Sequence, residues 1–73
     1  METVKLVIQI PRYEIAFLAF ILESYEGVAT MRTRDAQQGI VELLTPPQQR
    51  SELKEILRDL ESEFNIKYLT PTL

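Results

Sequence analysis

Apolar and polar residues alternate along the first ten positions. Val4, Leu6, Ile8 and Ile10 alternate with more polar neighbours, which is the pattern of a half-buried β-strand that Pro11 ends. The next segment, Tyr13 to Gly27, is apolar around most of a helical wheel: its apolar arc spans roughly 220°, where a surface helix usually shows about 100°. The width of this arc predicts a helix that covers the sheet and a second surface as well.

Two further strands are predicted at Val28 to Arg34 and Gly39 to Leu44. The connecting residues Asp35 to Gly39 begin with an Asp and end with a Gly, which are turn formers, so we expect an antiparallel hairpin. With the turn centred on Gln37, Arg32 lies opposite Glu42, and Met31 lies opposite Leu43. The hairpin is therefore expected to carry an ion pair on one face and an apolar pair on the core face.

The segment from Thr45 onward predicts a second, conventional helix. Thr45 and Gln48 have the spacing of a capping box, with proline at the first helical position, and Asn65 is the expected C-cap. Its apolar residues fall on one narrow stripe at helical spacing. They are Leu53, Ile56, Leu57, Leu60 and Phe64. A short last strand is expected from Ile66 to Thr70, before Pro71.

The predicted element order is β-α-β-β-α-β, which is the α+β plan of the ferredoxin-like split βαβ fold. It implies one domain over residues 1–73, with two helices on one face of a four-stranded antiparallel sheet. Right-handed crossovers place the first strand beside both the third and the last. The other sheet face would be a mixed surface. Its residues would be Lys5, Val7, Gln9, Thr30, Arg32, Ile40, Glu42 and Leu44.

Composition excludes several kinds of site. The chain of 73 residues has 0 Cys and 0 His, so it cannot hold a disulfide, an iron–sulfur cluster or a thiolate zinc site, and we expect no metal and no cofactor. A net charge of −3, and the lack of stacking rings on the two central strands, argue against nucleic acid. No apolar run is long enough for a membrane span, and the opening residues lack a signal-peptide pattern, so a cytoplasmic location is expected.

Four parts of the chain carry a family resemblance: Arg12–Leu18, Ile21–Glu23, Tyr25–Ala29 and Gly39–Val41. Together they resemble a bacterial family of small stand-alone proteins described as a domain of unknown function, and the topology is similar to ACT-like regulatory domains. The resemblance to ACT-like domains implies frequent dimerisation and an amino-acid ligand near the turn from first strand to first helix. A glycine commonly permits close approach there, whereas the turn Gln9–Arg12 of this chain contains none.

That turn also contains the candidate ligand site. Ile10 has no side-chain oxygen to cap the following helix, so the first-turn N–H groups, together with Gln9 and Arg12, are a candidate site for a small carboxylate or an amino acid. The simpler interpretation is a solvated arginine with amides bonded to water. No catalytic residue is predicted. A basic group formed by Lys5, Arg32 and Arg34 is better explained by cross-strand pairing than by nucleic-acid contact.

A chain this short gains from burying a second surface, so a homodimer or higher homo-oligomer is expected. The candidate interface residues are Tyr13 and Phe20 on the helix, and Val7, Ile40 and Leu44 on the uncovered sheet face. We therefore expect a non-catalytic, homo-oligomeric interaction or ligand-sensing module. The alternative is a small-molecule-binding or hydrolytic enzyme that uses the start of the first helix.

Overall fold

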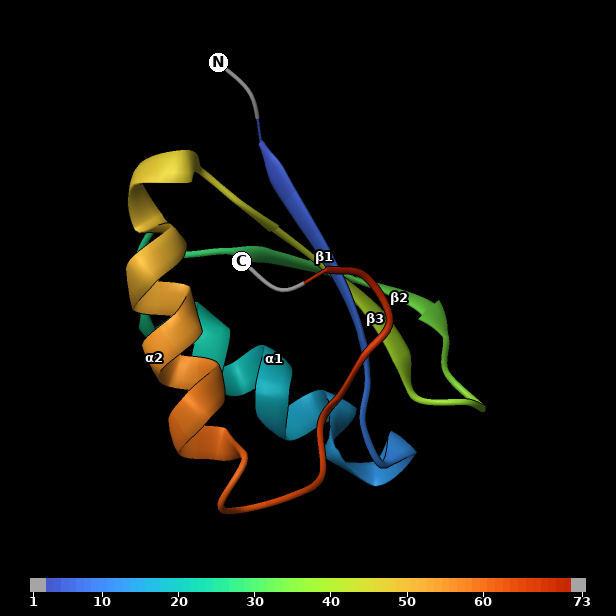
Figure 1. Cartoon of the computed structure of the whole chain (residues 1–73). Helices are drawn as coiled ribbons and strands as arrows, with labels where there is room; N and C mark the ends of the chain where they lie inside the picture. Colours follow the sequence, from blue (N-terminus) through green and yellow to red (C-terminus); the bar gives the residue numbers. More distant parts are fainter. Residues whose placement is uncertain (1–2, 72–73) are drawn as a thin grey trace.

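A four-stranded antiparallel sheet carries both helices on one of its faces in the computed structural model, which describes residues 3–71 (Figure 1). The elements are β1 (Val4–Gln9), η1 (Arg12–Glu14), α1 (Ile15–Ser24), β2 (Thr30–Asp35), β3 (Ile40–Thr45), η2 (Pro47–Gln49), α2 (Arg50–Leu60) and β4 (Lys67–Tyr68). This arrangement confirms the ferredoxin-like split βαβ plan. Met1 and Glu2, part of the opening segment used to predict the location, lie outside the described residues.

The strand order is β2-β3-β1-β4, so β1 lies between β3 and β4 as right-handed crossovers predict. In the pairing of β1 with β3, Leu6 lies opposite Leu43 and Ile8 opposite Val41. These four side chains are fully buried under the helices. Alternation along each strand then directs the intervening residues to the other face, which we call the outer sheet face.

The core lies between the sheet and the two helices, and the helices contribute to it unequally. From α1, only Leu18 and Leu22 are buried. From α2, four residues are buried: Leu53, Ile56, Leu57 and Leu60. Met31, which was expected on the core face, is only partly buried because β2 is an edge strand, and Ala29 just before β2 is partly buried as well. The second helix therefore covers the sheet more completely than the first.

The first helix begins later and ends earlier than its apolar pattern predicts. A turn of 3-10 helix precedes it, and Pro11 at the start makes no side-chain capping hydrogen bond. Gly27 has the positive φ of 77° expected after a helix, although the helix itself ends at Ser24. Within residues 3–71, neither helix is long and apolar enough to cross a membrane.

The predicted capping box of the second helix is wrong. The Thr45 hydroxyl is fully buried at the end of β3 and donates a hydrogen bond to the carbonyl oxygen of Val28 at 2.6 Å. A buried carbonyl needs a partner, and this tertiary demand takes the hydroxyl away from the helix start. A 3-10 turn separates Thr45 from α2. The predicted cap at Asn65 is also wrong, because α2 ends at Leu60 with Glu61 as its C-cap.

The hairpin has the predicted register, with Arg32 opposite Glu42 and Met31 opposite Leu43. Its ion pair has a different donor, because Arg34 Nε lies 2.9 Å from Glu42 Oε1. The register shifts between Thr33 and Asp35, and the extra residue at this bulge is Arg34. The bulge turns the Arg34 side chain toward Glu42, which sequence spacing alone does not reveal.

Candidate interaction surface on the first helix

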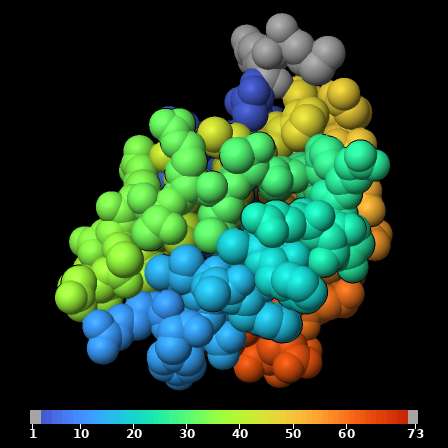
Figure 2. Space-filling model, turned by 180° about the vertical axis from the view of Figure 1, so that it is seen from behind, coloured from blue at the N-terminus to red at the C-terminus, as the bar shows by residue number. Residues whose placement is uncertain are grey.

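The rings of Tyr13, Phe17 and Phe20, in the first helical segment, face solvent. Tyr13 is 80% exposed, Phe20 is 64% exposed and Phe17 is 42% exposed. Their spacing of four and then three residues places them on one side of the helix, and we call them the aromatic stripe. Figure 2 shows the molecule from behind, and the blue and teal atoms of this segment lie across that face. A helix surface in this position is ordinarily polar.

The side of α1 that faces the sheet is already in use. Leu18 and Leu22 are buried against the sheet, and Ile15 packs partly buried against the same core. The ring of Phe17 makes an edge-to-face contact with Phe64, with ring centroids 6.4 Å apart and planes at 80°. On the wide apolar arc of this helix, the flank with Ile15 and Leu22 therefore belongs to the core, and the flank with Tyr13 and Phe20 faces solvent.

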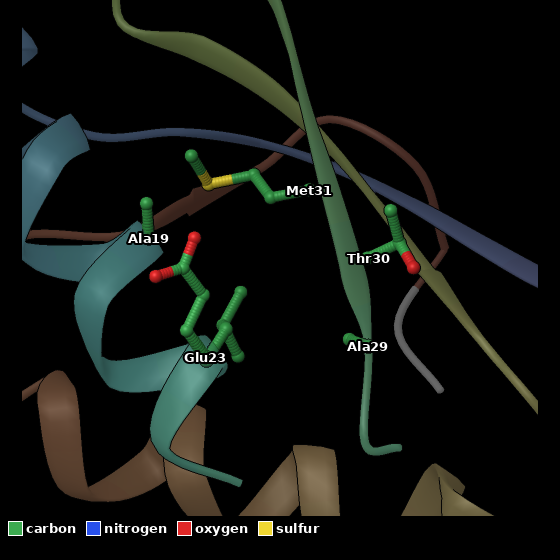
Figure 3. A pocket seen from close by; sticks show the side chains of 6 residues that line it. Ala19, Glu23, Ala29, Thr30 and Met31 are labelled. Carbon is green, nitrogen blue, oxygen red and sulfur yellow. The ribbon is translucent and has the colours of Figure 1, made fainter. Parts of the chain in front are cut away.

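A shallow hollow of about 270 Å³ lies between α1 and β2, beside the aromatic stripe. We call it the edge hollow. In Figure 3, Met31 extends from β2 toward α1, and the Glu23 side chain rises from α1 into the same space. The hollow is lined by Ala19, Leu22, Glu23, Ala29, Thr30 and Met31. Its lining surface is divided about equally between polar and apolar atoms, and Glu23 supplies its one carboxylate.

Gln9 and Arg12, the predicted ligand site, lie together and both contact the β2–β3 turn. The Gln9 amide donates to the carbonyl oxygen of Gln38 at 2.7 Å, and Arg12 Nη1 donates to Gln37 Oε1 at 2.8 Å. The Ile10 N–H donates to the carbonyl oxygen of Gly39 at 2.9 Å. These bonds attach the start of α1 to the hairpin. A ligand at this point would have to use donors left over from them.

The outer sheet face holds the other predicted interface residues. Val7 is only 5% exposed, so it offers little contact area, whereas Ile40 and Leu44 are half-buried. Glu42 is buried among them and is paired with Arg34. The strand registers place further basic side chains around this centre. They are Lys5, Arg32 and Lys67. Basic groups therefore predominate on this face, although the whole chain is acidic.

One titratable group has a strongly altered pKa. Burial of Tyr68 raises the pKa of its phenol above the usual value, and the hydrogen bond that it donates to Glu61 at 2.7 Å raises it further. The phenol is neutral at physiological pH and can donate this hydrogen bond. The bond joins β4 to the end of α2. Within residues 3–71 there is no cluster of three or more Asp and Glu side chains placed to hold a metal ion.

Two members of this surface were missed by sequence reasoning. Phe17 is not among the predicted interface residues, although one side of its ring contacts Phe64 and the rest is exposed. Its spacing from Tyr13 and Phe20 was the available signal. Glu23 is not among the candidate site residues either, and nothing in the sequence shows that β2 lies close enough to form a hollow beside it.

A comparison with models of protein families assigns the chain to a family, because one model matches most of its length. The model of a family described as a domain of unknown function (DUF4911) matches residues 8–63. The chain belongs to this DUF4911 family. The match includes the aromatic stripe, the edge hollow and the hairpin, and it stops before β4. No curated protein and no solved structure shows significant similarity to the chain.

Proposed function

We propose that this member of the DUF4911 family is a non-catalytic interaction module that works as a homodimer, with an ACT-like, ligand-sensing role in the bacterial cytoplasm. The observation that carries the proposal is the aromatic stripe, whose rings at Tyr13 and Phe20 are mostly exposed. Isolated exposed apolar residues are common on soluble proteins, whereas a contiguous apolar patch is typical of an interaction site.

The size of the patch supports a contact with another protein. From the exposed fractions of its three rings, the aromatic stripe leaves about 400 Å² of aromatic surface in water. That is as large as the largest apolar patch of a typical monomer, and about half of what one partner contributes to a standard interface. To form an interface of standard size, a second copy would need to cover the surface on either side of the stripe as well.

The other available surfaces are less suited to self-association. Two copies joined through their outer sheet faces would bring Lys5, Arg32 and Lys67 of one copy against the same basic groups of the other. Like charges brought together in this way oppose association. The edge strands of the sheet are β2 and β4. β2 has a bulge and charged side chains, and β4 is only two residues long, which are features that prevent strand pairing. We therefore favour the first helix.

Ligand sensing is the second part of the proposal, and it concerns Gln9 and Arg12. Arginine has five donor N–H groups, so Arg12 can keep its bond to Gln37 and still bind a small carboxylate or an amino acid. Such a ligand would sit where the hairpin meets the start of α1. A hydrolytic enzyme at this point is supported less well, because neither side chain has a nucleophile or a general base beside it among its bonded partners.

The experiment is to measure molar mass by light scattering at micromolar concentration, for the natural protein and two variants. We expect a dimer for the natural protein and a monomer for Phe20→Glu, because a charge in the buried stripe would lose its hydration. Ile40→Glu, a similar change on the outer sheet face, is the matched control and should remain dimeric. A monomeric natural protein would overturn the proposal, and the reverse result for the two variants would move the interface to the outer sheet face.

A further inference from the structure

The two charges beside the aromatic stripe lie at opposite ends of it. Arg12 stands at its N-terminal end, where it reaches Gln37 in the β2–β3 turn. Glu23 stands at its C-terminal end, where it lines the edge hollow against β2. Both are therefore on the hairpin side of α1. Within residues 3–71 the only salt bridge is that of Arg34 with Glu42, so neither Arg12 nor Glu23 forms a salt bridge with another residue of this range.

We propose that two copies pair through antiparallel α1 helices about a two-fold axis, with Arg12 of each copy against Glu23 of the partner subunit. This inference rests on the proposed homodimer and specifies how it is built. A two-fold axis that runs across the helix pair reverses the helix direction and keeps the hairpin side of both helices on the same side of the interface. The basic end of one stripe then meets the acidic end of the other twice.

The alternative two-fold arrangement has parallel helices, and it leaves the charges unpaired. Its axis runs along the helix pair and puts the hairpin sides of the two helices on opposite sides of the interface, so Arg12 and Glu23 of each copy have no opposite charge of the partner helix beside them. It also aligns the two helix dipoles, whereas antiparallel packing sets the positive end of each helix beside the negative end of the other. Electrostatic complementarity therefore favours one orientation even though the aromatic rings alone fit both.

The side chains along the stripe are compatible with this register. If Arg12 is level with Glu23 of the partner subunit, the same offset places Ala16 level with Ala19 of the partner subunit, since each residue advances both helices by about 1.5 Å. Two small side chains allow the helices to approach closely on the hairpin side. Tyr13 then falls between Phe20 and Ser24 of the partner subunit, in the manner of a knob in a hole.

The same pairing accounts for the edge hollow. Ala19 and Glu23 line the hollow, so a helix packed against them adds its wall to the open side. The contact area then extends beyond the aromatic stripe toward β2, which supplies the flank that the stripe alone lacks. Arg12 is free to make the new contact without giving up the turn, because its bond to Gln37 uses one of its five donors.

Charge reversal tests the pairing directly. R12E and E23R each place like charges together twice in the dimer, and we expect each to raise the dimer dissociation constant about tenfold or more, measured by sedimentation equilibrium. The double variant R12E/E23R restores the attraction with reversed sign and should return the constant to near that of the natural protein. R58E, on the exposed side of α2, is the control and should leave it unchanged. High salt should reduce all the differences.

Cross-linking supplies a readout that does not depend on the bond between Arg12 and the turn. The chain has no cysteine, so Ala16→Cys and Ala19→Cys each introduce a single thiol. In the antiparallel register, a mixture of the two proteins should form the mixed disulfide in preference to either homodimer disulfide. Parallel helices would instead join Ala16→Cys to itself.

The outcomes separate this inference from the proposed function. If the natural protein is dimeric and Phe20→Glu dissociates it, but the double variant shows no restoration and the mixed disulfide does not form, the antiparallel register is wrong while the interaction module stands. If the single reversals leave the dissociation constant unchanged, the ion pairs are absent and the register is overturned. A monomeric natural protein overturns both.

Discussion

The two helices pack on the same sheet but differ in how much of their apolar surface they bury there. α2 buries four residues on one stripe and exposes charged residues around the rest, so its apolar surface is fully used within one chain. α1 buries only Leu18 and Leu22, and its solvent side carries the aromatic stripe. Both helices are similar in length, so the difference lies in what each covers. A single domain explains the composition of α2, whereas α1 has apolar surface that this domain leaves exposed.

The two helices also begin in a similar way, without a side-chain cap. In place of caps, both helix starts depend on the hairpin. The start of α1 is bonded to the β2–β3 turn through Gln9, Ile10 and Arg12. The approach to α2 is fixed by Thr45, which is bonded to Val28 just after α1. Bonds to the hairpin and its end therefore position the starts of both helices, although only α2 buries all of its apolar side chains against the sheet.

The strongest test of this comparison replaces one large apolar residue on each helix. Leu57→Ala empties a fully packed position in α2 and should lower the free energy of unfolding by about 2–5 kcal/mol. Phe20→Ala removes a ring that is 64% exposed, and at concentrations where the protein is monomeric it should change that free energy by about 0.5 kcal/mol or less. Urea unfolding followed by circular dichroism measures both. Equal losses would show that the stripe belongs to the core.

The next test concerns the β2–β3 turn, which is hydrogen-bonded to the start of α1. Gly39 has φ of 72°, and a Cβ there would lie 1.8 Å from the carbonyl oxygen of Ile10. Gly39→Ala should therefore destabilise the protein by about 3 kcal/mol, from backbone strain and displacement of β1. Gly27→Ala is the matched control, since Gly27 has φ of 77° with open space around it, and should cost about 1 kcal/mol. Thermal unfolding compares the two.

The smallest effect is expected where β4 joins the end of α2. Tyr68→Phe removes the hydrogen bond to Glu61 and should lower the free energy of unfolding by about 0.5 kcal/mol at pH 7, because the bond is exposed. Burial raises the pKa of Tyr68, so folding favours the neutral phenol. Its contribution is complete below the unfolded pKa of about 10 and is lost as the pH rises above that value. The variant should lose less stability than the natural protein above pH 10, in unfolding curves at several alkaline pH values. Identical curves would contradict a stabilised phenol.

The local patterns of the chain predicted most of the fold. Alternation and helical periodicity are properties of neighbouring residues, so they gave the order of elements, and the hairpin length gave the pairing of Met31 with Leu43. The wide apolar arc of α1 was visible for the same reason. The ends of elements were less predictable, since the Thr45 hydroxyl has two possible partners and only packing selects Val28.

The surface depended on contacts that periodicity does not contain. Because of a bulge, Arg34 forms the ion pair with Glu42. The hairpin turn accepts hydrogen bonds from Gln9 and Arg12. By itself, the sequence determined that α1 has more apolar surface than one sheet can cover. The tertiary structure decided which side is left over, because Phe64, which follows α2, and strand β2 lie beside the two flanks of α1 and leave Tyr13 and Phe20 in solvent.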